Sequence, residues 1–300
     1  MSRGRRYHSQ LLTFRDLSSV TTVPNTAQIE IWDGAGGEHW VAEAARYDRM
    51  NARFAERIIE SLAPKAGERV LDVGCGNGAL ALAIAGLIGP DGSVVGLDVS
   101  GPMLANARRR ADAAGKTNVT FDKGDAQVHP IAEQSFDAIV SRFGVMFFED
   151  PIAAFRNLQR ALKPGGRLAF TCWQDLFRNE WIMVPAGAAL QHVPMPDLGE
   201  PGGPGPFSFA DADRQRTVLS DAGFTEIELE EVVRPMMIGD SVDDALHFLQ
   251  NSDMGDVLFT GVDDETAARA WADVREALAA HATPDGVVLN GTVWLTTARA

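Results

Sequence analysis

The chain is poor in cysteine: Cys75 and Cys172 are the only two in 300 residues. They lie far apart and neither belongs to a C-x-x-C pair, which disfavours a disulfide framework and a zinc site. Apolar runs long enough to cross a bilayer are also missing, as is the apolar leader of a secretory signal. We therefore expect a cytoplasmic protein without stable membrane insertion and without a bound metal ion.

Positive charge is scarce as well, because 27 Lys and Arg residues face 41 Asp and Glu residues, giving a formal net charge of −14. Binding to nucleic acid requires clustered basic residues, so this balance disfavours an RNA or DNA partner. Two basic clusters do occur. Residues 1–24 begin with several arginines and are expected to form a flexible extension, and the triplet Arg108–Arg110 is typical of a solvated helix face.

The stretch around which the chain is organised is RVLDVGCGNGALALAIA, residues 69–85. Its first residues are an apolar run that predicts a buried parallel strand, and its last residues predict a helix. Between them stand Gly74, Gly76 and Gly78 at alternate positions. A strand, a glycine turn and a helix in this order place backbone N–H groups around a small concavity. The sequence therefore predicts a site for a nucleotide-type ligand.

Two ligands suit this turn. Residues 74–79 match the dinucleotide pattern G-x-G-x-x-G/A, and Asp98 follows roughly 20 residues later, as a ribose-binding acid does in dinucleotide sites. The same segment resembles motif I of the class I S-adenosylmethionine-dependent methyltransferases, in which an acid stands two residues before the first glycine. Asp72 holds that position here. A carboxylate there would repel a pyrophosphate, whereas it would attract the sulfonium and the amino group of S-adenosylmethionine.

The resemblance continues in order from residue 70 to residue 173. The string LDVSGPML, residues 97–104, is similar to the motif whose acid binds the ribose hydroxyls, and GDA, residues 124–126, to the motif that binds adenine. LKPGGRLAF, residues 162–170, is typical of the ubiquinone/menaquinone biosynthesis-type small-molecule methyltransferases. The resemblance implies S-adenosylmethionine as cosubstrate, held by Asp72, Gly74, Gly76, Gly78, Asp98, Val99, Met103, Asp125, Ala126 and Ser141.

Strand and helix patterns alternate along the chain, which predicts an α/β fold. The resemblance specifies a Rossmann-like, mostly parallel sheet with a final antiparallel strand, helices on both faces, and helical cap and lid inserts. We expect a helical cover at 25–66, the donor-binding core at 67–175 and a lid at 176–216. The C-terminal part of the core follows at 217–300, with strands at 227–233 and 292–298 and a helical insert at 236–285.

The acceptor site has fewer sequence markers. The chain lacks the Asn/Asp-Pro-Pro-aromatic sequence typical of methyltransferases that act on amide or adenine nitrogens. SRFG, residues 141–144, stands at that place, and the apolar segment that follows it, residues 145–148, suits a hydrophobic acceptor. The residues expected to line the acceptor pocket are Trp32, Trp40, Tyr47, Arg142, Phe143 and Met146.

Methyl transfer from a sulfonium needs a base only when the acceptor must lose a proton. Candidate bases are His39, Glu180, His192 and His247, and His192 is preferred because it lies in the predicted lid. The function predicted is in-line transfer of a methyl group to a small, apolar acceptor at oxygen, carbon or nitrogen. An NAD(P)-dependent oxidoreductase and a non-catalytic S-adenosylmethionine-binding regulator are the alternatives, and a homodimer is compatible with this interpretation.

Overall fold

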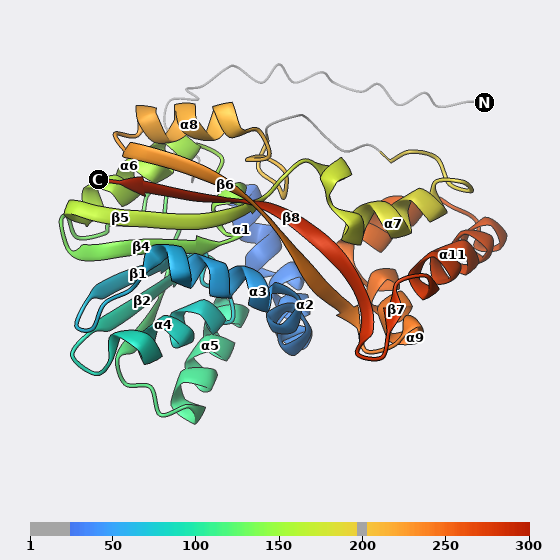
Figure 1. Cartoon of the computed structure of the whole chain (residues 1–300), viewed down its shortest axis with the longest axis horizontal. Helices are drawn as coiled ribbons and strands as arrows, with labels where there is room; N and C mark the ends of the chain where they lie inside the picture. The colour runs from blue at the N-terminus through green and yellow to red at the C-terminus, as the bar shows by residue number, and fades with distance from the viewer. Residues whose placement is uncertain (1–24, 197–202) are drawn as a thin grey trace, which may run out of the picture.

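The computed structural model describes residues 25–196 and 203–300, so the predicted extension at 1–24 lies outside the described residues. In this part of the chain one sheet of eight strands has the order β3-β2-β1-β4-β5-β8-β6, with the short β7 paired to β8 (Figure 1). The strands are β1 Arg69–Val73, β2 Ser93–Asp98, β3 Val119–Lys123, β4 Phe136–Arg142, β5 Leu162–Trp173, β6 Thr225–Gly239, β7 Ala282–Thr283 and β8 Gly286–Arg299.

Strands β1 to β5 pair in parallel, and β8 enters antiparallel between β5 and β6. The central strands are apolar along their length because both of their faces are covered: Leu71 of β1 pairs with Val95 and Ile139 and is almost fully buried. The predicted Rossmann-like α/β fold with a final antiparallel strand is confirmed.

Helices cover both faces of this sheet (Figure 1). On one face lie α3 Ala44–Leu62, α4 Ala79–Ile88 and α5 Gly101–Ala113, and on the other lie α6 Pro151–Ala161 and α8 Ala212–Asp221. Helix α3 carries a buried stripe, Met50, Phe54, Ile58 and Leu62, at helical spacing. This stripe fixes α3 across β5 and β6, so the first turns of α3 project over the carboxyl ends of the parallel strands.

Strands β6 and β8 form a ribbon that extends past the sheet and carries the last helices (Figure 1). These are α9 Val242–Gln250, α10 Asp253–Phe259 and α11 Asp264–Ala279, with α7 Glu180–Ala189 packed on α11. The sequence placed the start of the insert at 236 and the last strand at 292, and both bounds were wrong. The ladder continues through Met236 paired with Leu289, since both side chains are buried there.

Helices α1 Thr26–Asp33 and α2 Ala35–Ala42 precede α3 and complete the N-terminal cover. None of the helices in the described residues combines the length and the apolar character needed to cross a membrane.

Candidate functional site

A pocket opens where β1 and β4 end, between the sheet and the N-terminal cover. Its floor is the glycine turn with the start of α4, its roof comes from α2 and α3, and its side comes from the end of β4. The lining residues are Trp40, Tyr47, Asp48, Asn51, Asp72, Gly74, Cys75, Gly76, Asn77, Ala79, Leu80, Arg142 and Phe143. Seven residues predicted from the sequence are among them: Trp40, Tyr47, Asp72, Gly74, Gly76, Arg142 and Phe143.

The glycines of the turn serve different purposes. Gly74, with φ +64°, lies so close to the loop after β4 that a Cβ would stand 2.6 Å from the Cα of Gly144. Gly78, with φ +77°, does not line the pocket; a Cβ there would stand 3.0 Å from the Cβ of Ala107 and from the ring of Phe121. The third glycine therefore allows close packing of α4 against α5 and β3, and its predicted contact with a ligand has no support in this placement.

Asp98 ends β2 and is held by the backbone on both sides of the turn. Its Oδ2 accepts a hydrogen bond from the N–H of Gly76 at 2.7 Å, and its Oδ1 accepts one from Ser100 at 2.8 Å. Burial raises the pKa of this carboxyl group above its ordinary value. Ser100 caps α5 by accepting from the N–H of Met103, so Asp98, Val99 and Met103 form one connected edge beside the turn.

Asp98, Val99 and Met103 do not line the pocket, whereas Asp72 lines it and is only 1% exposed. Its Oδ2 has no hydrogen-bond partner among the described residues. Burial raises its pKa to about 7, with the guanidinium of Arg142 opposing the rise and the carboxyl group of Asp98 adding to it. An unpartnered buried carboxyl oxygen costs free energy, so this position favours a ligand that brings a donor or a positive charge.

Arg142 ends β4 and is the basic residue that lines the pocket. Burial lowers its pKa, while Asp48 and Asp72 act in the opposite direction. Its Nη2 stands 3.9 Å from Oδ1 of Asp48. The next residue, Phe143, has φ 65° and stacks on Trp173 with ring centroids 4.3 Å apart. A left-handed conformation costs roughly 1–2 kcal/mol outside glycine, and here aromatic packing holds it at the pocket mouth.

Three polar residues of the pocket were not anticipated, namely Asp48, Asn51 and Asn77. Oδ1 of Asn51 is buried without a partner in the described part of the chain. Asn51 interrupts the apolar stripe of α3 next to Met50, and a polar residue on a buried face was the signal that could have identified it.

One member of the arginine triplet, Arg110, differs from the prediction. Arg110 pairs with Asp48 and donates from Nη1 to the carbonyl of Asn77 at 2.9 Å. Arg108 donates to the carbonyl of Phe121. The prediction of a solvated face was wrong for Arg110, which is half-buried because α3 and the glycine turn supply acceptors that only the fold brings next to α5, whereas Arg108 and Arg109 are exposed.

The cover is anchored to the core beside the pocket. Oδ1 of Asp33 accepts from the N–H of Gly101 at 2.7 Å, and Oδ2 pairs with Lys123 at 2.6 Å. The carbonyl of Trp40 accepts from Nδ2 of Asn77 at 2.9 Å. These bonds place α1 and α2 directly over the glycine turn and the first residues of α5.

A row of aromatic rings runs through the cover, which we call the aromatic row. Its members in order are Phe147, Trp32, Trp40, Tyr47 and Phe248. Trp40 and Tyr47 are stacked, with centroids 3.9 Å apart, and the other neighbours meet edge to face at 5.0 to 5.9 Å. Trp32, predicted to line the pocket, does not line it; its ring packs edge to face against Trp40, which does.

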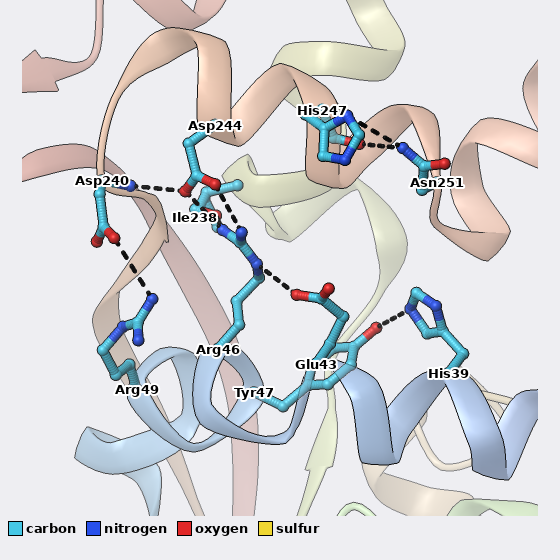
Figure 2. A network of polar contacts seen from close by, with 10 residues as sticks. All are labelled: His39, Glu43, Arg46, Tyr47, Arg49, Ile238, Asp240, Asp244, His247 and Asn251. Carbon is cyan, nitrogen blue, oxygen red and sulfur yellow. Dashed lines mark hydrogen bonds and ion pairs between the residues drawn. The ribbon is translucent and has the colours of Figure 1, made fainter.

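Arg46 joins the cover to the C-terminal insert (Figure 2). It makes two hydrogen bonds to Asp244 of α9, at 2.8 and 2.7 Å, and donates to the carbonyl of Ile238 at 3.0 Å. It also bonds Glu43 and lies over the ring of Phe248. The bonds from Arg46 lower the pKa of Asp244 to about 2.

Several predicted residues lie outside the pocket lining. Asp125 and Ala126 follow β3 and are buried, with burial raising the pKa of Asp125 and its Oδ2 unpartnered among the described residues. Ser141 of β4 accepts from the N–H of Gly144 at 3.3 Å. Met146 is 1% exposed and its Sδ accepts from the N–H of Trp173, so it belongs to the core and its predicted place in the acceptor pocket was wrong.

His192 follows α7 and pairs with Asp273 of α11 at 2.7 Å. It is absent from the pocket lining, so this placement argues against the catalytic role predicted for it.

Part of the predicted lid is bonded to the core, since Gly205 and Ser208 both donate to the carbonyl of Met146. Within 25–196 and 203–300, no group of three or more His, Cys, Asp or Glu residues is arranged to hold a metal ion.

A family model described as a methyltransferase domain matches residues 64–189. Aklanonic acid methyltransferase DauC from Streptomyces sp. (strain C5) is 34% identical over 163 residues, which cover 50% of this chain and 73% of that protein. The 2-phytyl-1,4-naphtoquinone methyltransferase of Synechococcus elongatus is 36% identical over 163 residues, which cover 48% of this chain and 70% of that protein. About half of this chain therefore lies outside each alignment.

Among solved structures, the phosphoethanolamine N-methyltransferase 2 of Haemonchus contortus in complex with S-adenosyl-L-methionine superposes with a TM-score of 0.55. It is 19% identical, and the match covers 93% of this chain and 60% of that one. At this identity the likeness supports the fold alone.

Proposed function

The chain belongs to the S-adenosylmethionine-dependent methyltransferase family, and from this premise we propose that it methylates a small, apolar acceptor at oxygen, carbon or nitrogen. It is an enzyme, and S-adenosylmethionine is its cosubstrate. Membership of this family argues against the two alternative functions considered above, an NAD(P)-dependent oxidoreductase and a non-catalytic S-adenosylmethionine-binding regulator. The two relatives described above are named for an organic acid and a naphtoquinone, which supports a small organic acceptor.

The observation that carries the proposal is the unpartnered, buried oxygen of Asp72 beside the open glycine turn. A cationic ligand would satisfy this oxygen and offset the cost of its burial. A pyrophosphate would add negative charge next to Asp72 and Asp98 instead. The charge of the pocket thus supports a sulfonium donor, with Asp72 facing the positive end.

We assign the other donor contacts by position. Asp98 stands at the end of β2, where its carboxylate can still accept from ribose hydroxyls while it holds Gly76 and Ser100. Val99 and Met103 lie beside Asp98 and are assigned to the same part of the donor. Asp125 and Ala126, which follow β3, are assigned to its adenine. Arg142, with Asn51 across the pocket, is assigned to the α-carboxylate of the donor, since it is the cation that lines this space.

When bound, S-adenosylmethionine supplies an activated methyl group together with its own leaving group. What this chain contributes is alignment and the exclusion of water. Alignment of two reactants can supply on the order of 7–11 kcal/mol. The aromatic row closes the pocket from above, and Arg46 ties that roof to the C-terminal insert. An acceptor bound under Trp40 and Tyr47 would meet the donor in a space with little solvent.

Calorimetry with S-adenosylmethionine, its demethylated product and NADH tests the donor assignment. We expect binding of the first two and none of NADH. Asp98→Ala should weaken donor binding at least about tenfold, because two backbone contacts and the ribose acceptor are lost together. Asp122→Ala, at an exposed position of the neighbouring strand β3, is the matched control and should bind like the parent protein. Unchanged affinity of the Asp98 variant would contradict the site.

A further inference from the structure

We propose that Tyr47 and His39 form a proton relay and that the acceptor is an aromatic compound methylated at a hydroxyl group. Nε2 of His39 and the hydroxyl oxygen of Tyr47 are 3.1 Å apart, and the two side chains come from successive helices, α2 and α3 (Figure 2). The inference rests on the methyl transfer proposed above, and it names the acceptor class and the residue that takes the acceptor's proton.

The positions of the two side chains suit a relay that runs outward. Tyr47 lines the pocket together with Asp72 and the glycine turn. His39 does not line it and is half-buried, so a proton received there can leave to solvent. Histidine is the residue type best suited to accept and release a proton near neutral pH. His39 therefore connects the hydroxyl group of Tyr47 to bulk water.

The surroundings of Tyr47 explain why its phenol needs a proton acceptor such as His39. Burial raises the pKa of its phenol, and the negative charges of Glu43 and Asp253 raise it further against the opposing effect of Arg46. The phenol thus stays protonated in neutral solution and can take a proton from an acceptor only if it passes its own proton on. A stacked Trp40 and an edge-on Phe248 fix the ring, so the hydroxyl is held toward His39.

The step balances in atoms and charge. The acceptor hydroxyl gives its proton to the oxygen of Tyr47, and the phenol proton of Tyr47 moves to Nε2 of His39. The acceptor oxygen forms a bond to the methyl carbon as the bond between that carbon and the donor sulfur breaks. The products are a methyl ether, a neutral thioether and a protonated His39. The acceptor is expected to be aromatic because the pocket wall facing it consists of Trp40 and Tyr47.

Naphthol and naphthoate make a matched pair of probe acceptors, because they share a ring system but only naphthol must lose a proton. Parent protein, Tyr47→Phe, His39→Gln and the control Glu38→Gln, at an exposed position of α2, are assayed with S-adenosylmethionine by the thioether formed. For Tyr47→Phe and His39→Gln we expect kcat with naphthol to fall about 100-fold or more. Donor affinity by calorimetry should be unchanged, and Glu38→Gln should behave as the parent.

Two further measurements separate a relay from a structural role. Free imidazole should restore activity to His39→Ala. The parent protein should lose kcat at acidic pH, and this loss should be absent in His39→Gln. Full activity of Tyr47→Phe on naphthol would overturn the proposal. So would a parent protein that binds the donor but methylates naphthoate only, or neither compound. Failure to bind the donor would instead contradict the proposed function.

Discussion

At the scale of single residues, the ionised carboxylate of Asp72 lowers the stability of the donor-free protein but strengthens its binding of the donor. Its pKa is raised from 3.8 to about 7, so the folded protein holds this proton more tightly than the unfolded chain does. Stability is therefore lost as pH rises from 3.8 through about 7, and the full penalty is present above that value.

Asp72→Asn should consequently raise the melting temperature of the donor-free protein at about pH 8 and change it much less at about pH 4, where the folded state is protonated and the unfolded chain is ionised only in part. Differential scanning fluorimetry over this range measures the effect. Glu60→Gln, at an exposed position of α3, is a control that should change nothing. A lower melting temperature of the Asp72 variant at about pH 8 would mean that the carboxylate is already compensated.

The same carboxyl group should make donor affinity depend on pH. Only ionised Asp72 can attract the positive end of the donor, so affinity should rise as pH increases through about 7 and then level off. In Asp72→Asn the affinity should be weaker and this pH dependence should vanish. Calorimetry in buffers of different ionisation enthalpy also detects the proton that is released on binding. A variant with the parent's pH profile would show that another group titrates.

At the scale of elements, the half-buried side chain of Arg46 links α3 to α9 (Figure 2). The side chain of Arg46 is 13% exposed and bonds Asp244, Glu43 and the carbonyl of Ile238. Asp244→Ala should lower the free energy of unfolding by roughly 2–4 kcal/mol, because it leaves much of this guanidinium without its partner. Urea unfolding measures the loss.

The matched control for this contact is Asp240→Ala. Asp240 pairs with Arg49 across the same interface at 3.7 Å, but both side chains are largely exposed, so the change should cost less than about 1 kcal/mol. Since the pKa of Asp244 is lowered to about 2, its contribution is present above pH 3.8 and is lost as pH falls toward 2. Equal effects of the two variants would indicate that Arg46 does not hold these elements together.

At the scale of the whole molecule, the N-terminal cover contacts both the donor side and the C-terminal insert. Asp33 and Trp40 bond α5 and the glycine turn, while Arg46 bonds α9. Binding of the demethylated donor should therefore slow amide hydrogen exchange across α1 and α2 as well as in the turn. The edge strand at 226–233, remote from the pocket, is the internal control. Protection confined to the turn would show that the cover opens independently of the ligand.

The fold and the donor side of the site could be predicted from the sequence because they depend on local signals. A buried strand, three spaced glycines and an acid at each strand end, Asp72 and Asp98, follow one another along the chain. Parallel strands bring their carboxyl ends to one edge whatever the rest of the protein does. Of these residues, Asp72, Gly74 and Gly76 line one pocket, while Gly78 packs against α5 and β3 and Asp98 lies beside the turn.

What only the tertiary structure decided lies where distant segments meet. The partners of Arg110 and Arg46 are 62 and 198 residues away in sequence, and the choice between His192 and His39 depends on which helix covers the pocket. Met146 likewise changed from pocket to core because Trp173 packs against it. Periodicity tells which face of an element is apolar, but it does not tell which other element will cover that face. The sequence alone therefore determined the methyl donor, and packing of the cover against the sheet and the insert decided which side chains surround the pocket.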